Sequence, residues 1–166
     1  VVPRDVLGVN LAIRADLLGE AGAAFDPRLG PSGTRKIDYE ELELVTRLNA
    51  GHRILYVPNA VVRHRIAADR MTWRYMRSLM YQRGFGSARL RVIRGEQLPV
   101  LPRRISRVLR TWVPARAARR VNAARDMPLP KHARDEFDAY FEFGNQVGLL
   151  LLPYPHLTDW AADRLA

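Results

Sequence analysis

A change in hydrophobic pattern at His64 constrains the fold of this chain more than any other feature of its sequence. Before this residue, apolar side chains stand in short runs rich in valine, isoleucine and leucine, at residues 6–14, 53–58 and 59–64. The last two runs meet at a Pro-Asn pair, which is typical of two strands joined by a tight connection. After His64, segments with helical spacing follow one another to the C-terminus. The pattern predicts a small α/β part followed by a helical part.

Two helices are expected within the α/β part. A short helix covers "ADLLGEAG" and closes at Gly22, because glycine commonly ends a helix. A longer helix is predicted from Glu40 to Asn49, with Gly51 just beyond it. Between them, residues 25–38 contain two prolines and two glycines, which indicates an irregular loop.

Further glycines and prolines divide the sequence at other points. Gly8 interrupts the first apolar run, where a second backbone or a ligand can approach the chain closely. In the helical part, one helix is predicted to stop at Gly84 and the next at Gly95. A third helix is bracketed by Pro102 and Pro114. The helical part is therefore expected to consist of several separate helices.

The composition is that of a globular protein of one domain, with 48% hydrophobic and 27% charged residues in 166. Cysteine is absent, which excludes disulfides and thiolate metal sites and favours a reducing, cytoplasmic location. The longest apolar run, Val147–Leu152, is far shorter than the roughly 20 residues of a membrane-spanning helix. Because the chain opens on Val1 in strand-like sequence, we expect it to be a piece of a longer protein or a processed one.

Positive charge is concentrated in the middle of the sequence. Residues 63–125 contain 17 basic and 2 acidic side chains, whereas the formal net charge of the whole chain is +10. Such a block indicates an anionic partner: phosphates of a small molecule, a lipid surface or nucleic acid. Nucleic acid is disfavoured, because the sequence lacks helix-turn-helix, zinc-finger and aromatic RNA-binding signatures.

The helix predicted between Pro102 and Pro114 combines this charge with an apolar stripe. The stripe has helical spacing and is formed by Ile105, Val108, Leu109 and Trp112, with arginines on the remaining surface. Two interpretations follow. Either the stripe packs on the core and the arginines face solvent, or the helix lies in the interface of an anionic membrane.

Four carboxylates fall within the stretch "IDYEELEL" at the start of the second predicted helix: Asp38, Glu40, Glu41 and Glu43. Helix geometry separates them, because residues three, four and seven apart share a face. Glu41 continues into an apolar stripe, whereas Glu40 shares a water-facing stripe with Glu43 and Arg47, which are spaced for an ion pair. Glu41 therefore stands at the loop end of the buried face.

Two roles are open for these acids. Desolvation would raise the pKa of Glu41 toward that of a useful general base, although the helix N-terminus opposes this rise by favouring the anion. Alternatively, all four acids only cap the helix and complement its dipole.

The acidic stretch is one of four blocks that together resemble a known family. In order and approximate spacing, the blocks are similar to the C-terminal half of family-2 glycosyltransferases, inverting enzymes with a GT-A, Rossmann-like α/β fold: "GVNLAIRADLL", "AGAAFDPRLG", "YEELEL" and "AGHRILYVPNAVVRH". The resemblance covers roughly residues 1–89. It implies that residues 1–90 form the acceptor-side half of a GT-A catalytic domain and that residues 91–166 form a basic amphipathic helical extension.

The resemblance implies a catalytic role for the acidic stretch. The second acid of the family's motif is the catalytic base, which takes a proton from the acceptor hydroxyl as this attacks the sugar of a nucleotide-diphospho-sugar. That acid corresponds to Glu41. The family often has glycine where this sequence has Tyr39, and the following helix is one residue short. A shift of the alignment by one residue would place Glu40 at the position of the base, so the choice between Glu41 and Glu40 is open.

Four further residues become candidates through the resemblance. His64 occupies the place of a histidine that approaches the divalent metal or the diphosphate, or else it caps the end of a strand. Asn10 contacts the acceptor or holds the adjacent loop. Arg83 and Ser87, beside two glycines, bind the donor diphosphate, or their segment is only a break between helices.

The resemblance also implies partners outside this sequence. The donor's divalent cation, Mn²⁺ or Mg²⁺, is held mostly by a D-x-D motif of the N-terminal half, and this sequence has no such motif before its first predicted strand. We therefore expect function to require that half, on the same or another chain, with a saccharide, lipid-linked or small-molecule acceptor. The chain is expected to be cytoplasmic and peripheral at the inner face of the membrane. The alternative is a non-catalytic module that binds a membrane or a partner protein.

Overall fold

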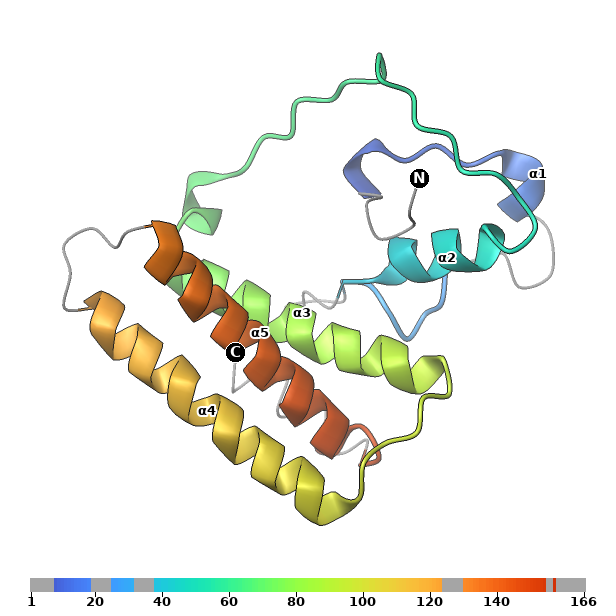
Figure 1. The fold of residues 1–166 in the computed structure, drawn as a ribbon. Coiled ribbons are helices and arrows are strands. Elements are labelled where there is room, and N and C mark those ends of the chain that lie inside the picture. The colour runs from blue at the N-terminus through green and yellow to red at the C-terminus, as the bar shows by residue number, and fades with distance from the viewer. Residues whose placement is uncertain (1–7, 19–24, 32–37, 124–129, 155–156, 158–166) are drawn as a thin grey trace.

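The computed structural model describes residues 8–18, 25–31, 38–123, 130–154 and 157, and every regular element among them is helical. A 3-10 turn at Gly8–Asn10 precedes α1 (Ala15–Leu18) and α2 (Glu40–Leu48). A second 3-10 turn at Ala68–Arg70 leads into the three long helices, which are α3 (Trp73–Ile93), α4 (Leu101–Ala123) and α5 (Pro130–Leu151). Figure 1 shows α5 between α3 and α4, with α2 on the opposite side of α3.

The predicted α/β part, and with it the GT-A fold, is wrong. The described residues contain no strand and no sheet. Residues 53–64 keep only the tight connection expected at the Pro-Asn pair, where the Ala60 N–H donates to the Val57 carbonyl at 3.0 Å. Leu55, Tyr56 and Val61 are between 73% and 79% exposed. Such residues favour strands because they pack on a pleated, half-buried surface, and the described part of the chain supplies no neighbouring strand to form one.

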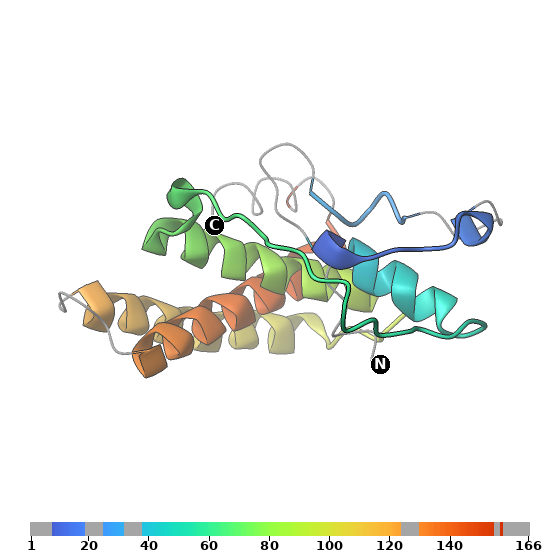
Figure 2. The same ribbon diagram turned by 90° about the horizontal axis from the view of Figure 1, so that it is seen from above.

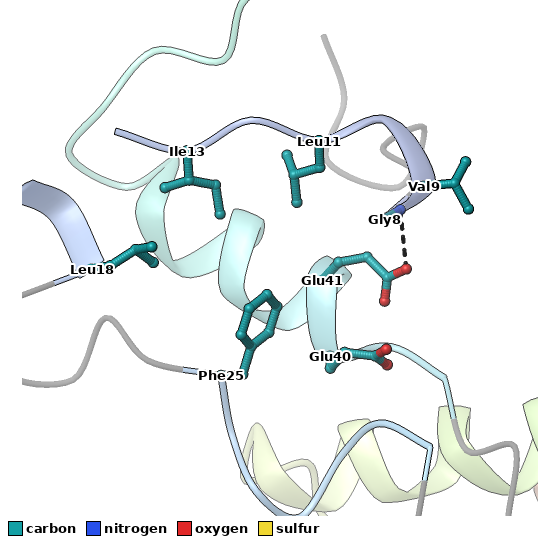
Figure 3. Close-up of a pocket in the computed structure, with 8 residues that line it drawn as sticks. All are labelled: Gly8, Val9, Leu11, Ile13, Leu18, Phe25, Glu40 and Glu41. Carbon is teal, nitrogen blue, oxygen red and sulfur yellow. Dashed lines mark hydrogen bonds between the residues drawn. The ribbon is translucent and has the colours of Figure 1, made fainter. Parts of the chain in front are cut away.

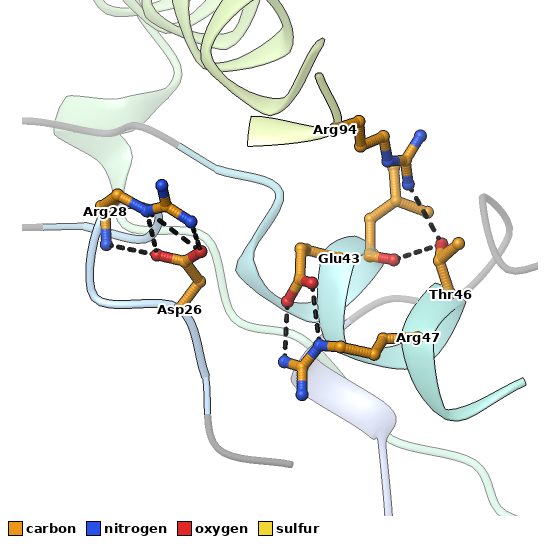
Figure 4. A network of polar contacts seen from close by, with 7 residues as sticks. Asp26, Arg28, Glu43, Thr46, Arg47 and Arg94 are labelled. Atoms are coloured by element: carbon orange, nitrogen blue, oxygen red, sulfur yellow. Dashed lines mark hydrogen bonds and ion pairs between the residues drawn. The ribbon is translucent and has the colours of Figure 1, made fainter. Parts of the chain in front are cut away.

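The predictions for the first two helices agree with the structure where it describes them. α2 begins at the expected Glu40 and ends within a residue of the expected end, and α1 covers the first part of "ADLLGEAG". Its predicted stop at Gly22 lies outside the described residues. Leu44 and Val45 of the predicted apolar stripe are buried, and Glu43 forms the predicted ion pair with Arg47 at 2.9 Å. Beside this pair, an Asp26–Arg28 ion pair of 2.6 Å closes the loop below α2 (Figure 4).

The predicted break at Gly84 is wrong, because α3 continues through this residue and crosses the expected boundary at residue 90. Gly84 lies against α5, where an added Cβ would stand 1.9 Å from the Phe141 carbonyl oxygen. From the other helix, a Cβ on Gly144 would stand 2.0 Å from the Tyr81 carbonyl oxygen. The glycines thus allow two helix backbones to approach closely. The predicted stop near Gly95 is confirmed, since α3 ends at Ile93.

The core of the helical part is formed by aromatic and apolar side chains of all three long helices. Tyr81, Phe85, Ala115, Phe143 and Val147 form one buried cluster. At one end of the bundle, the fully buried carboxylate of Glu136 pairs with Arg77, whose guanidinium lies 5.6 Å from the centre of the Trp73 ring. Figure 2, seen from above, shows the long helices stacked in layers.

α4 is one continuous helix with Pro114 inside it, so the predicted end at this proline is wrong. One residue of its apolar stripe packs on the core, and the other three are exposed. Val108 packs on the core cluster, whereas Ile105, Leu109 and Trp112 are 45%, 60% and 42% exposed. Neither interpretation of the sequence describes the whole stripe, because only part of it faces the core.

Candidate functional site

Glu40 and Glu41 lie at one end of an open pocket of about 670 Å³ (Figure 3). The 3-10 turn, the segment after it, α1 and the loop before residue 31 supply the other walls. Apart from the two carboxylates, the lining is apolar or backbone: Gly8, Val9, Leu11, Ile13, Leu18 and Phe25. The pocket therefore offers two acids beside a surface suited to the apolar part of a small molecule.

The carboxylate of Glu41 is oriented by the backbone of the 3-10 turn. Its Oε1 accepts a hydrogen bond of 3.1 Å from the Gly8 N–H. A Cβ on residue 8 would stand 2.6 Å from the same oxygen, so the approach requires glycine. A close approach does occur at Gly8, but the approaching group is the side-chain carboxylate of Glu41, where the sequence predicted a backbone or a ligand.

Glu40 occupies a different environment from its neighbour. Its Oε2 is buried and accepts no hydrogen bond within the described part of the chain. Burial raises the pKa of Glu40 above its ordinary value, and the negative charge of Glu41 and a hydrogen bond with that side chain act in the same direction. From the sequence, the raised pKa was expected for Glu41. The structure instead raises the pKa of Glu40, the residue assigned from the sequence to the water-facing side.

Replacing Glu40 by glutamine is expected to make the protein more stable at neutral pH. The pKa of Glu40 is higher in the folded protein than in the unfolded chain, so the folded state binds the proton more tightly. Its ionisation therefore lowers stability as pH rises through the folded pKa. Glu40→Gln removes this loss, and its advantage should vanish well below the ordinary pKa of 4.5. Urea unfolding across this pH range measures the difference, and a constant difference would contradict the assignment.

The acidic stretch is anchored to α3 by the two residues predicted to bind the donor. Arg83 pairs with Asp38 at 2.5 Å, and Ser87 forms a hydrogen bond with Tyr39. Arg83 and Ser87 are one helical turn apart and therefore share a face of α3. From their positions in α3, Arg83 and Ser87 hold the acidic stretch in place. The glycine-rich turn expected around them is absent, because α3 is helical throughout this segment.

Tyr39, immediately before α2, adopts a backbone conformation that side chains rarely take. Its φ of 88° is in the left-handed region, where glycine is the least strained residue. This conformation explains why a glycine would suit the position. Burial raises the pKa of the Tyr39 hydroxyl, and the hydrogen bond with Ser87 opposes the rise. The half-buried ring and this bond hold the strained residue that positions Glu40 and Glu41.

The other two predicted site residues lie apart from the pocket lining. Asn10 is exposed, and its Nδ2 donates to the Ala60 carbonyl at 2.7 Å, so it ties the 3-10 turn to the connection between α2 and α3. His64 lies exposed in that connection. No group of three or more His, Asp or Glu side chains in the described part of the chain is placed to hold a metal ion.

Several features of the site carried no recognisable sequence signal. Phe25 follows residues with no clear periodicity, yet its ring forms one wall of the pocket (Figure 3). The left-handed Tyr39 could not be recognised from its residue type, because tyrosine seldom adopts this conformation. Gly8 did carry a signal, since a glycine within an apolar run marks a close approach.

Comparison with known proteins adds no family to these observations. The sequence matches no protein-family model, and neither curated proteins nor solved structures show a match to it. Among the described residues, no helix has both the length and the apolar character needed to cross a membrane. We therefore infer function from the site itself.

Proposed function

We propose that this chain carries the acceptor-activating site of an inverting glycosyl transfer, with Glu41 as general base. The observation that carries the proposal is the placement of Glu40 and Glu41 side by side on an apolar pocket in two different environments. The proposal rests on this site and on the similarity of the four sequence blocks. It does not depend on a GT-A fold.

The two carboxylates support different roles. Burial raises the pKa of Glu40, so it retains its proton to higher pH than an ordinary glutamate, and its Oε2 is buried. Glu41 lines the pocket with its carboxylate held in one orientation by the Gly8 N–H, and we assign it the role of the base. A base held in one orientation beside a bound hydroxyl meets the geometric requirement for general-base catalysis.

The proposed reaction is a single displacement. Glu41 takes the proton of an acceptor hydroxyl, whose oxygen forms the new bond to the anomeric carbon as the nucleoside diphosphate leaves from the opposite face. The apolar walls suit the hydrophobic face of a saccharide or the apolar part of another acceptor. Donor binding, including any divalent cation, is assigned to an N-terminal half on the same or another polypeptide.

A donor screen with the complete protein tests this function. The protein, with its upstream half, is incubated with a panel of nucleotide-diphospho-sugars and candidate acceptors, and release of nucleoside diphosphate is measured. Acceptor-dependent release and a product of inverted anomeric configuration are expected. A retained configuration would contradict a single displacement. Absence of release with every pair would favour the non-catalytic module.

Gly8→Ala is expected to lower transfer without unfolding the protein. The new Cβ would stand 2.6 Å from Oε1 of Glu41, and the flexible carboxylate can turn away. Misplacement of a catalytic group by about 1 Å costs up to roughly 100-fold in rate, so we expect kcat/KM to fall by about 10- to 100-fold. Gly51→Ala is the matched control, because among the described residues other than its chain neighbours no atom lies within 4 Å of its Cβ position. Equal rates for the two variants would contradict the role of Gly8.

A further inference from the structure

The outward side of α4 carries a continuous apolar surface. Four of its exposed residues follow one another at intervals of four, and a tryptophan stands three residues after the third of them, so they share one helix face. We call this set the α4 face: Leu101, Ile105, Leu109, Trp112 and Val113. Single exposed apolar residues are common on proteins, but a contiguous strip of this length indicates an interaction surface.

The side of α4 next to the α4 face accounts for its packing within the bundle. Val108 and the buried Ala115 contact the core cluster, and Arg104 donates to the Leu149 carbonyl of α5 at 3.2 Å. α4 thus uses one side to bind α5, and Figure 1 shows it at the edge of the bundle, with α3 and α5 between it and α2. The α4 face therefore lies outside the packing that builds the fold.

Charge accompanies the α4 face. The α4 sequence contains 7 arginines and no acidic residue. Arg103 and Arg107 are exposed on the side of α4 turned away from the α4 face, and within the described part of the chain no carboxylate pairs with either of them. The guanidinium of Arg116 lies 5.1 Å from the centre of the Trp112 ring, which brings a cation to the apolar strip itself.

We propose that the α4 face binds the surface of an anionic lipid bilayer. A bilayer interface accepts aliphatic side chains and tryptophan at the level of the headgroups, while arginine side chains reach the lipid phosphates. A second copy of the chain would bring two arginine-rich helices together, and their charges would repel. Nucleic acid would use the arginines but would leave the aliphatic strip exposed to water. A lipid surface satisfies both features.

Vesicle co-sedimentation of the full chain tests this inference. Binding is expected to vesicles of mixed phosphatidylglycerol and phosphatidylcholine, with much weaker binding to phosphatidylcholine alone and loss of binding at high salt. Equal binding to both vesicles, or to neither, would overturn the proposal. The measurement needs no donor or acceptor, so its outcome is independent of the proposed transfer reaction.

Paired variants locate the contact on α4. Leu109→Ser with Trp112→Ser is expected to lower the partition coefficient by at least about tenfold, because it removes apolar area from the contact. Arg116→Gln should lower it by about fivefold, because Arg116 lies beside Trp112 on the α4 face. The matched controls are Leu55→Ser with Tyr56→Ser and Arg63→Gln, which alter exposed residues outside α4. Both should bind as the unaltered chain does.

Two outcomes of these variants would overturn the proposal. If the controls lose binding as strongly as the α4 variants, the contact depends on total charge or apolarity and is not made by the α4 face. If the unaltered chain is a dimer and the Leu109 and Trp112 changes dissociate it, the face binds a second copy. Circular dichroism verifies that the variants keep their helices, as expected for exposed positions.

Discussion

Glu41→Gln is expected to lower kcat/KM for sugar transfer by about 100- to 10,000-fold, the range that a general base contributes. The substitution keeps the size of the side chain, and the amide oxygen can still accept the Gly8 N–H that now binds Oε1. What is lost is the ability to take a proton from the acceptor. Transfer is measured as nucleoside diphosphate release by the complete protein, and thermal unfolding should be nearly unchanged.

Two neighbouring acids serve as matched controls for this substitution. Glu40→Gln should reduce transfer by less than about tenfold, because Glu40 positions its neighbour and does not accept the proton. Glu43→Gln should leave the rate unchanged, since Glu43 pairs with Arg47 outside the pocket lining. A large loss of transfer in Glu40→Gln with a retained rate in Glu41→Gln would identify Glu40 as the base. Retained rates in all three variants would contradict general-base catalysis at this pocket.

The local part of the site could be predicted from the sequence. Helix periodicity identified α2, the buried Leu44 and Val45, and the Glu43–Arg47 pair. These features depend on residues three or four positions apart, whose relation is fixed by the geometry of one helix. The sequence placed Glu41 on the buried side and Glu40 on the water-facing side, whereas in the structure it is the pKa of Glu40 that burial raises. This difference depends on which chain segments cover each carboxylate.

Long-range features of the fold could not be predicted in this way. Valine-rich runs at residues 53–64 predicted strands, yet a strand forms only when another strand lies beside it. Gly84 and Pro114 predicted helix ends because both lower local helix propensity. In the structure, α3 continues through one and α4 through the other. At Gly84 the reason is a close contact with α5, whose residues lie about 60 positions further along the chain.

The helical part and the pocket are mechanically connected through α3. One face of this helix holds Asp38 and Tyr39 through Arg83 and Ser87. On another face of α3, Tyr81 and Phe85 pack in the core cluster with side chains of α5. The position of the acidic stretch therefore depends on how closely α3 and α5 pack. A change at their contact should affect both stability and the site.

Gly84→Ala is expected to produce a large loss of stability. The new Cβ would stand 1.9 Å from the Phe141 carbonyl oxygen and 2.8 Å from the Asn145 nitrogen. Both are backbone atoms, so relief requires α3 and α5 to move apart and expose part of the core cluster. Overpacking of a core costs about 1–3 kcal/mol and more where backbone must move, which outweighs the roughly 1 kcal/mol gained when alanine replaces glycine in a helix.

We expect the free energy of unfolding to fall by about 3 kcal/mol and the Tm by roughly 6–12 °C, measured by urea and thermal unfolding. Gly51→Ala controls for adding a methyl group in open space and should change stability by less than about 0.5 kcal/mol. Gly144→Ala, which would place a Cβ 2.0 Å from the Tyr81 carbonyl oxygen, should match Gly84→Ala. An unchanged or raised Tm in both core variants would mean that α3 and α5 do not cross at these glycines. In that case, α3 would no longer account for the placement of Asp38 and Tyr39.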